Sequence, residues 1–207
     1  MSADRNALCS WLADLAAVLV VDEDDVADFN SRISAAPDLS APDFSAELLS
    51  LIRVIGESVS SPEGFDSLKA GSFADPDTDN AGKILLAVGL ALAGGRSGWI
   101  SRPQARAGRE RISAAGDAAL AVASSIGADA ADLYGWLSNL VQVAVRLVSD
   151  IAADLVPVVR VETGISLPSC VLSYKLYGDA TRAGSLVDIA GSATPMLMPV
   201  GFDALEG

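Results

Sequence analysis

The sequence contains no histidine and only two cysteines among its 207 residues. Without histidine the chain cannot build a Ser-His-Asp triad, a histidine metal site or the most common general base near neutral pH. The P-loop, GxSxG and CxxC motifs are also missing. We therefore predict that the protein is not an enzyme and uses no cofactor. Cys9 and Cys170 lie far apart within apolar helical patterns, and we expect both to be buried free thiols.

Lysine and aromatic residues are scarce, whereas acidic residues are abundant. The formal net charge is −13 at pH 7, and this acidity disfavours nucleic acid as a partner because phosphates would be repelled. Hydrophobic residues make up 51% of the chain and are mostly alanine, valine and leucine. Small apolar side chains of this kind favour helices that pack closely against one another.

The most hydrophobic run is residues 83–95, KILLAVGLALAGG. Its apolar core is shorter than the ~20 residues that a membrane-spanning helix needs. We therefore predict a buried helix over about residues 81–93 and no membrane span. Further helices are expected behind Asp4 and behind Asp43 or Ser45, because these side chains favour the N-cap position.

Two acidic clusters allow two interpretations each. Asp22–Asp25 precedes an apolar helical pattern, and Asp75, Asp77 and Asp79 have the alternate spacing that opens a calcium-binding loop. The first run is too compact for such a loop, and the second lacks the downstream glutamate. Both clusters therefore favour acids at the start of a helix, where the macrodipole stabilises them, over a cation site.

Positive charge is concentrated in one part of the chain. Residues 81–112 hold six basic residues against one acid, whereas residues 1–80 hold sixteen acids and four bases. Arg102, Arg106 and Arg109 share one face of a predicted helix because they are four and three residues apart. This face is either a solvated surface or a stripe that docks on the acidic part of a neighbouring copy. DNA is the less favoured partner, because no aromatic residues alternate with the arginines.

Two long helical patterns follow one another. From residue 103 to about 126, apolar residues form a narrow seam: Ile112, Ala115, Ala119, Val122 and Ile126. The next pattern is a heptad-like stripe of Leu133, Leu137, Leu140, Ala144, Leu147 and Ile151, which Trp136, Val141 and Val148 widen. Because the connection is short, we predict an antiparallel hairpin. Burial of the stripe within one chain is favoured over a coiled coil between chains.

The C-terminal part reads as a strand, two short helices and a second strand. Residues 156–161 form a β-branched run typical of a strand, and residues 196–205 offer a weaker one. Between them, Gly178 suits the end of one helix and Asp179 the N-cap of the next. The first helix is expected to turn an apolar face inward that contains Leu167, Val171, Tyr174 and Leu176.

The segment that carries this turn, LPSCVLSYKLYGDATRAGSLVDIAG, resembles a known family. It is similar to the C-terminal end of the Mu-type phage tail proteins called DNA circulation (circularisation) proteins. That end is itself similar to a LysM-like module, in which a YGD-x-[ST]-R turn joins two helices. The residues that fit the turn are Tyr177, Gly178, Asp179, Thr181 and Arg182. The resemblance covers roughly the last hundred residues, and the segment after Gly191 departs from the family's usual pattern.

The patterns together predict a mainly α protein. We expect an acidic helical region (residues 1–95), a long antiparallel helical hairpin (96–155) and a small βααβ module (156–207), which the resemblance makes LysM-like. The residues expected at interfaces are Arg102, Arg106, Arg109, Tyr174, Tyr177, Gly178, Asp179 and Arg182.

The resemblance also implies a function. It indicates a structural virion protein of a phage tail, at the tip or baseplate near the hub, made in the host cytoplasm before assembly. Its hairpin and module would dock on other tail proteins, in a ring of three or six copies. One alternative is a peptidoglycan-binding module, although protein docking is favoured over glycan. Another is a factor that protects or circularises DNA after injection.

Overall fold

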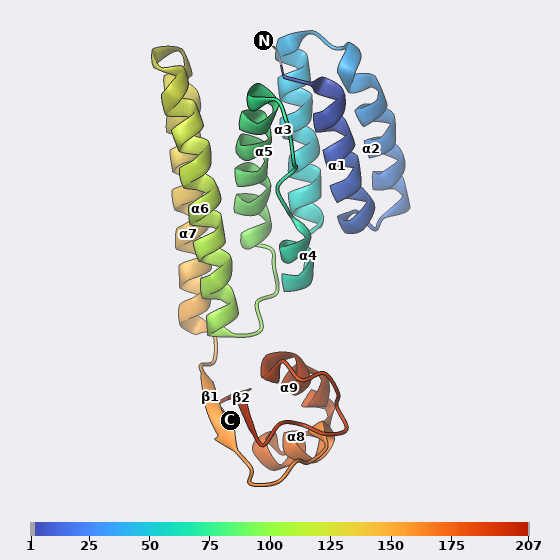
Figure 1. The fold of residues 1–207 in the computed structure, drawn as a ribbon, viewed down its shortest axis with the longest axis vertical. Helices are drawn as coiled ribbons and strands as arrows, with labels where there is room; N and C mark the ends of the chain where they lie inside the picture. The colour runs from blue at the N-terminus through green and yellow to red at the C-terminus, as the bar shows by residue number, and fades with distance from the viewer. Residues whose placement is uncertain (1–2, 207) are drawn as a thin grey trace. The chain divides into compact units, whose positions relative to one another are not determined.

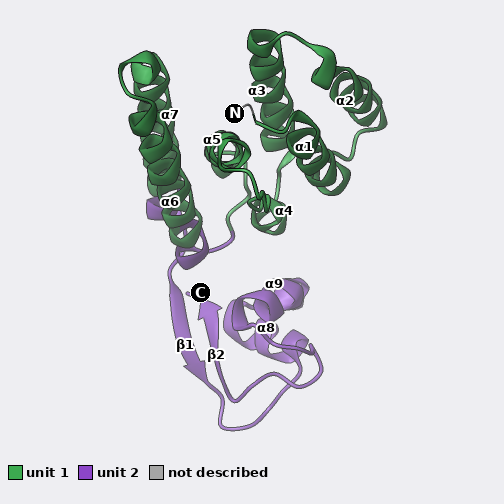
Figure 2. Cartoon of the chain, turned by 45° about the horizontal axis from the view of Figure 1, so that its top comes forward, with its two compact units in different colours: residues 1–99, 106–150 green, residues 100–105, 151–207 purple. Residues whose placement is uncertain are grey.

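The computed structural model describes residues 3–206 as a mainly α-helical chain with a small antiparallel sheet (Figure 1). The chain divides into two compact units, which Figure 2 shows in green and purple. Residues 1–99 and 106–150 form the first unit, and residues 100–105 and 151–207 form the second. The predicted N-terminal region and most of the predicted hairpin therefore belong to one unit.

The first unit begins with a group of helices that short polar side chains cap. The helices are α1 (Arg5–Leu19), α2 (Glu23–Ala35), α3 (Ala41–Ser58), α4 (Pro62–Ser67) and α5 (Pro76–Gly94), with a 3₁₀ turn η1 (Ala36–Asp38). Their N-terminal N–H groups donate to Asp4, Asp22, Ser40, Ser61 and Asp75 respectively. The predicted cap at Asp43 or Ser45 is wrong, because the Ser40 hydroxyl accepts the N–H of Asp43 instead.

Helices α3 and α5 pack through small residues at the centre of this group. A Cβ added to Gly56 would lie 3.0 Å from the carbonyl oxygen of Gly89, so the two backbones approach very closely. Ile52 fills the adjacent space and is fully buried. The hydrophobic run therefore forms a buried helix as predicted, although the helix already begins at Pro76. No helix within residues 3–206 is both long and apolar enough to cross a membrane.

Helices α6 (Arg102–Ile126) and α7 (Ala131–Asp154) form the predicted hairpin, joined by η2 (Ala128–Ala130). They run side by side in Figure 1. Gly116 allows their close contact, since a Cβ there would lie 2.5 Å from a methyl group of Val141. The buried face of α7 consists of Leu137, Val141, Ala144, Val148 and Ala152. It includes two of the residues expected to widen the stripe, whereas the third, Trp136, is 46% exposed.

Two residues of the predicted seams face solvent instead. Ile126 is 55% exposed and Leu147 is 46% exposed. Ile126 is the last residue of α6, immediately before Gly127, whose positive φ of 85° ends the helix. Ile112, Ala119 and Val122 are buried, as expected.

The second unit has the predicted order of strand, helix, helix and strand. It contains β1 (Val158–Glu162), α8 (Ser169–Tyr177), η3 (Ala180–Arg182), α9 (Ala183–Ala190) and β2 (Gly201–Leu205). The strands pair antiparallel, with Arg160 opposite Asp203 and Val161 opposite Phe202. The paired residues are 39 to 47 positions apart in sequence, so two distant segments close this unit.

Candidate functional site

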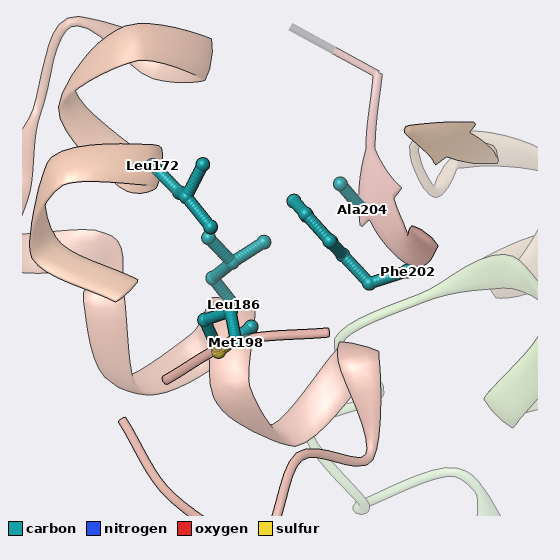
Figure 3. Close-up of a cluster of buried hydrophobic side chains, with 5 residues drawn as sticks. All are labelled: Leu172, Leu186, Met198, Phe202 and Ala204. Atoms are coloured by element: carbon teal, nitrogen blue, oxygen red, sulfur yellow. The ribbon is translucent and has the colours of Figure 1, made fainter. Parts of the chain in front are cut away.

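The second unit has its own hydrophobic core, shown in Figure 3. The side chains of Leu172 on α8 and Leu186 on α9 point toward Phe202 and Ala204 on β2. Met198, which is fully buried, closes the cluster from the segment before β2. This core fixes the two helices against the sheet, and thus fixes the turn between them.

The turn between α8 and α9 is built by the residues that carry the family resemblance. Gly178 has a left-handed backbone (φ 70°, ψ 6°), and its N–H donates to the Tyr174 carbonyl at 2.9 Å. Asp179 then caps η3 by accepting the N–H and the hydroxyl of Thr181 at 2.8 and 2.7 Å. The sequence prediction of a glycine helix end followed by an aspartate cap is therefore confirmed.

Hydrogen bonding also sets the electrostatics of this turn. The donors of Thr181, first its hydroxyl and then its backbone N–H, hold the pKa of Asp179 below its ordinary value of 3.8. The buried hydroxyl of Ser173 donates to the Asp179 carbonyl at 2.6 Å. Asp179 is thus occupied on both its side chain and its backbone by contacts within the unit.

Tyr177 and Arg182 also make internal contacts. The Tyr177 hydroxyl accepts the N–H of Leu205 at 3.0 Å, and its ring packs on the core of the unit. The Arg182 guanidinium lies 4.1 Å from the centre of the Tyr177 ring, a cation–π distance. The structure therefore brings four of the predicted interface residues together, and their contacts hold the turn in place.

Tyr174 differs from the other predicted residues of this turn. It is 65% exposed, and Val171 beside it is 39% exposed, so the predicted inward face of this helix is wrong. The helix instead buries Ser169, Leu172 and Ser173. The prediction failed because Ser173 reaches the Asp179 carbonyl and is satisfied in the interior, which an apolar pattern cannot reveal.

A second cluster lies where two loops of this unit meet. Between β1 and α8 on one side and α9 and β2 on the other, backbone hydrogen bonds join Thr163 to Val200, Leu167 to Met198 and Ser169 to Pro195. The most exposed large apolar side chains of these joined loops are Ile165 (63% exposed), Met196 (68%) and Leu197 (65%). We call these three residues the apolar tip.

Sequence reasoning overlooked the apolar tip, although a signal was present. Residues 163–174 and 189–202 contain no charged residue, in a chain that is 20% charged. These two stretches lie next to the paired strands β1 and β2, so together they form a surface without charged side chains. Exposed apolar groups that gather in this way mark sites of interaction.

The three arginines that were predicted to share one helix face, Arg102, Arg106 and Arg109, have different surroundings in the structure. The Arg102 guanidinium donates to the carbonyls of Ala152, Ala153 and Leu155, at 3.1, 3.2 and 3.1 Å. It therefore caps the C-terminal end of α7. Arg106 is exposed, and Arg109 makes only a 4.0 Å contact with Glu110.

Arg111, which was not a predicted site residue, connects two helices of the first unit. It donates to the Phe65 carbonyl at 2.9 Å, to the Asp66 carboxylate at 3.1 Å and to the Leu68 carbonyl. Its guanidinium also lies 5.1 Å from the centre of the Phe65 ring. Arg111 thus fastens α6 to the end of α4.

The sequence matches no family model, and no curated protein matches it as a relative.

The acidic clusters act as helix starts. Asp22 caps α2, and Asp75 caps α5 by accepting the hydroxyl and N–H of Thr78 at 2.6 and 2.9 Å. These two donors, the hydroxyl first, lower the pKa of Asp75. Among residues 3–206, no group of three or more acidic or cysteine side chains is arranged to hold a metal ion.

The two cysteines differ in exposure. Cys9 is buried and Cys170 is exposed, and neither forms a disulfide. The prediction of free thiols is confirmed, but the predicted burial of Cys170 is wrong. Cys170 occupies the solvent side of α8, next to the exposed Val171.

Proposed function

We propose that the protein is a structural component of a phage tail, located at the tip or baseplate near the hub. The support comes from the resemblance of residues 167–191 together with the geometry of the turn that they form. The residues of the YGD-x-TR pattern run from the last residue of α8 to the residue before α9, within a strand–helix–helix–strand unit, and the resemblance leads us to expect this arrangement in a LysM-like module. The role proposed is non-catalytic.

The apolar tip is the surface of the second unit that we assign to docking on a neighbouring tail protein. Ile165, Met196 and Leu197 present apolar groups without a nearby charge in the sequence. An apolar pocket on a protein suits such side chains, since burying them releases water and requires no polar partners.

The second docking surface is the face of α6 that carries Arg106 and Arg109. Neither guanidinium has a strong partner among the described residues, and both can reach an acidic neighbour. Helix α2 offers such a surface, with Glu23, Asp24 and Asp25 in its first turn. Contacts of this kind between successive copies would close a ring of three or six subunits.

Imaging of intact particles tests the location. A density map of the tail should contain this chain near the hub, and mass spectrometry of purified particles should detect it. The double substitution Met196→Ser with Leu197→Ser should reduce its incorporation without unfolding it, because both side chains are exposed. Val21→Ser is the matched control, since Val21 is 87% exposed in the first unit. Absence of the chain from purified particles would contradict the proposal.

Glycan binding is the second candidate. In LysM modules that recognise glycan, the loops beside the two helices hold N-acetyl sugars, and the corresponding loops here are joined by hydrogen bonds. The most exposed large side chains of these loops are apolar, and the exposed hydroxyls of Ser166 and Thr194 already take part in hydrogen bonds within the unit, which favours a protein partner. Co-sedimentation with purified peptidoglycan separates the candidates. Binding that is lost in the Met196→Ser, Leu197→Ser protein would favour glycan.

A further inference from the structure

Strand β1 has one edge that no other strand covers. The sheet contains β1 and β2 only, among the residues that the structure describes. The N–H of Thr163 donates to the Val200 carbonyl at 2.9 Å, and the N–H of Glu206 donates to the Pro157 carbonyl at 3.0 Å. These two bonds lie at opposite ends of the ladder and show which backbone groups of β1 point toward β2.

The pattern of an antiparallel ladder then identifies the groups on the open edge. Because successive residues alternate in direction, Val158, Arg160 and Glu162 turn their N–H and C=O groups away from β2. Within residues 3–206, the backbone groups of Arg160 and Glu162 on this edge form no hydrogen bond. The open edge can therefore accept another strand.

Charged side chains accompany these free backbone groups. Arg160 and Glu162 are both exposed and lie on the same face of the sheet. Arg160 forms an ion pair with Asp203 at 3.2 Å on the neighbouring strand, whereas Glu162 has no ion pair within the described part of the chain. Charges at an edge discourage indiscriminate pairing, so any partner strand must match them.

We propose that β1 binds β1 of a second copy of this chain, antiparallel, with Arg160 of each copy opposite Glu162 of the other. A two-fold axis then passes beside Val161, which faces its own equivalent. The contact is isologous, so each favourable pair occurs twice. The result is a four-stranded sheet with the order β2, β1, β1 and β2.

The charges select this register. Residues with outward backbone groups must face each other, so registers differ in steps of two residues along one strand. A shift in one direction sets Arg160 opposite Arg160, and a shift in the other sets Glu162 opposite Glu162. Of these three registers, only the proposed one opposes unlike charges.

The proposed pairing also covers apolar surface. Val159 lies on the helix side of the sheet but is 38% exposed, because β1 is an edge strand. A second strand would cover that side chain and add up to four backbone hydrogen bonds through the two Arg160–Glu162 pairs. The contact is small, so we expect a reversible dimer. The inference depends on the sheet edge and is independent of the proposed tail function.

Charge exchange tests the proposal in the full-length chain. Sedimentation velocity over a concentration series should show a monomer–dimer equilibrium. The variants are made with Asp203→Asn, so that position 160 has no ion-pair partner within its own chain, and Asp203→Asn alone is the control. Glu162→Arg and Arg160→Glu should each weaken dimerisation roughly tenfold, because two attractive pairs become repulsive. Combining the two substitutions should restore it.

A disulfide experiment tests the register. With Cys170 replaced by serine, Val161→Cys should give a covalent dimer on mild oxidation, because the two positions face each other across the axis. Val159→Cys in the same background should not, since it faces residue 163 of the second copy. A chain that stays monomeric at every concentration would overturn the proposal. So would a folded double charge variant, judged by circular dichroism, that fails to recover dimerisation.

Discussion

The hydroxyl group of Tyr177 accepts a hydrogen bond of 3.0 Å from the backbone N–H of Leu205. The last residue of α8 therefore holds the final strand in place. The bond also occupies a backbone group of β2 on the side away from β1, so the two edges of the sheet differ.

Tyr177→Phe should destabilise the second unit by about 1–3 kcal/mol, because the N–H of the buried Leu205 loses its acceptor. The ring remains, so packing against the core and against Arg182 is kept. Urea unfolding followed by circular dichroism measures the change. Tyr174→Phe is the matched control and should have almost no effect, since Tyr174 is 65% exposed. Equal losses in both proteins would contradict the assigned role.

Gly178→Ala should destabilise the same unit by about 1–2 kcal/mol, because an L-residue is strained at a φ of 70°. Gly184→Ala provides the comparison. Gly184 lies within α9 with no atom near its missing Cβ, so alanine there should be neutral or stabilising by up to about 1 kcal/mol. Thermal unfolding of both variants should show shifts in opposite directions or a shift for Gly178→Ala alone.

Arg102→Ala should destabilise the protein by about 1–3 kcal/mol, since three carbonyl groups at the end of α7 lose a charged donor. Arg106→Ala removes a charge from the same helix at an exposed position, where the expected change is within about 0.5 kcal/mol. Chemical unfolding compares the two. If Arg102 only contributed charge to the helix surface, both variants would lose the same free energy of unfolding.

The hydrogen bonds that Thr181 donates to Asp179 predict that the stability of the second unit falls at acidic pH. The pKa of Asp179 is lowered in the folded state, so its contribution is present above the unfolded value of 3.8 and is lost as the pH falls through the folded pKa. Thr181→Val should raise the Asp179 pKa toward 3.8, because the hydroxyl donor is lost while the backbone N–H remains. Carboxyl carbon NMR measures it directly. An unchanged pKa would show that the hydroxyl bond is not the main cause.

Gly116→Ala should destabilise the hairpin by about 1–3 kcal/mol through crowding of Val141. In a Val141→Ala background the same change should cost less, because the two crowding methyl groups are gone and only the Cβ of residue 141, 3.2 Å from the added Cβ, still limits the space. A double-mutant cycle on thermal unfolding detects this reduction. Effects that simply add would mean that the two side chains do not meet.

Periodicity and capping chemistry predicted much of the fold. Asp4, Asp22, Asp179 and Gly178 occupy the positions that their side chains or backbone freedom suggest. These signals are local, because a cap depends on residues within one turn. The order of strand, helix, helix and strand was predictable for the same reason.

Features that depend on distant partners were not predictable. Three residues of one helix formed an apparent stripe, yet Arg102 turns to carbonyls some fifty residues away. Ser173 can be buried because its hydroxyl donates a hydrogen bond to the Asp179 carbonyl. Tyr174 is exposed although it is aromatic. The apolar tip needs two loops to meet, which hydrogen bonds such as that between Thr163 and Val200 bring about.

The unequal exposure of the two thiols has a practical consequence. Under native conditions a maleimide should react at Cys170 and spare Cys9, whose burial shields it and raises its pKa. The wild-type protein thus carries a single addressable position on α8. A gold cluster or fluorophore attached there would report where the C-terminal unit lies in a particle without any engineered residue.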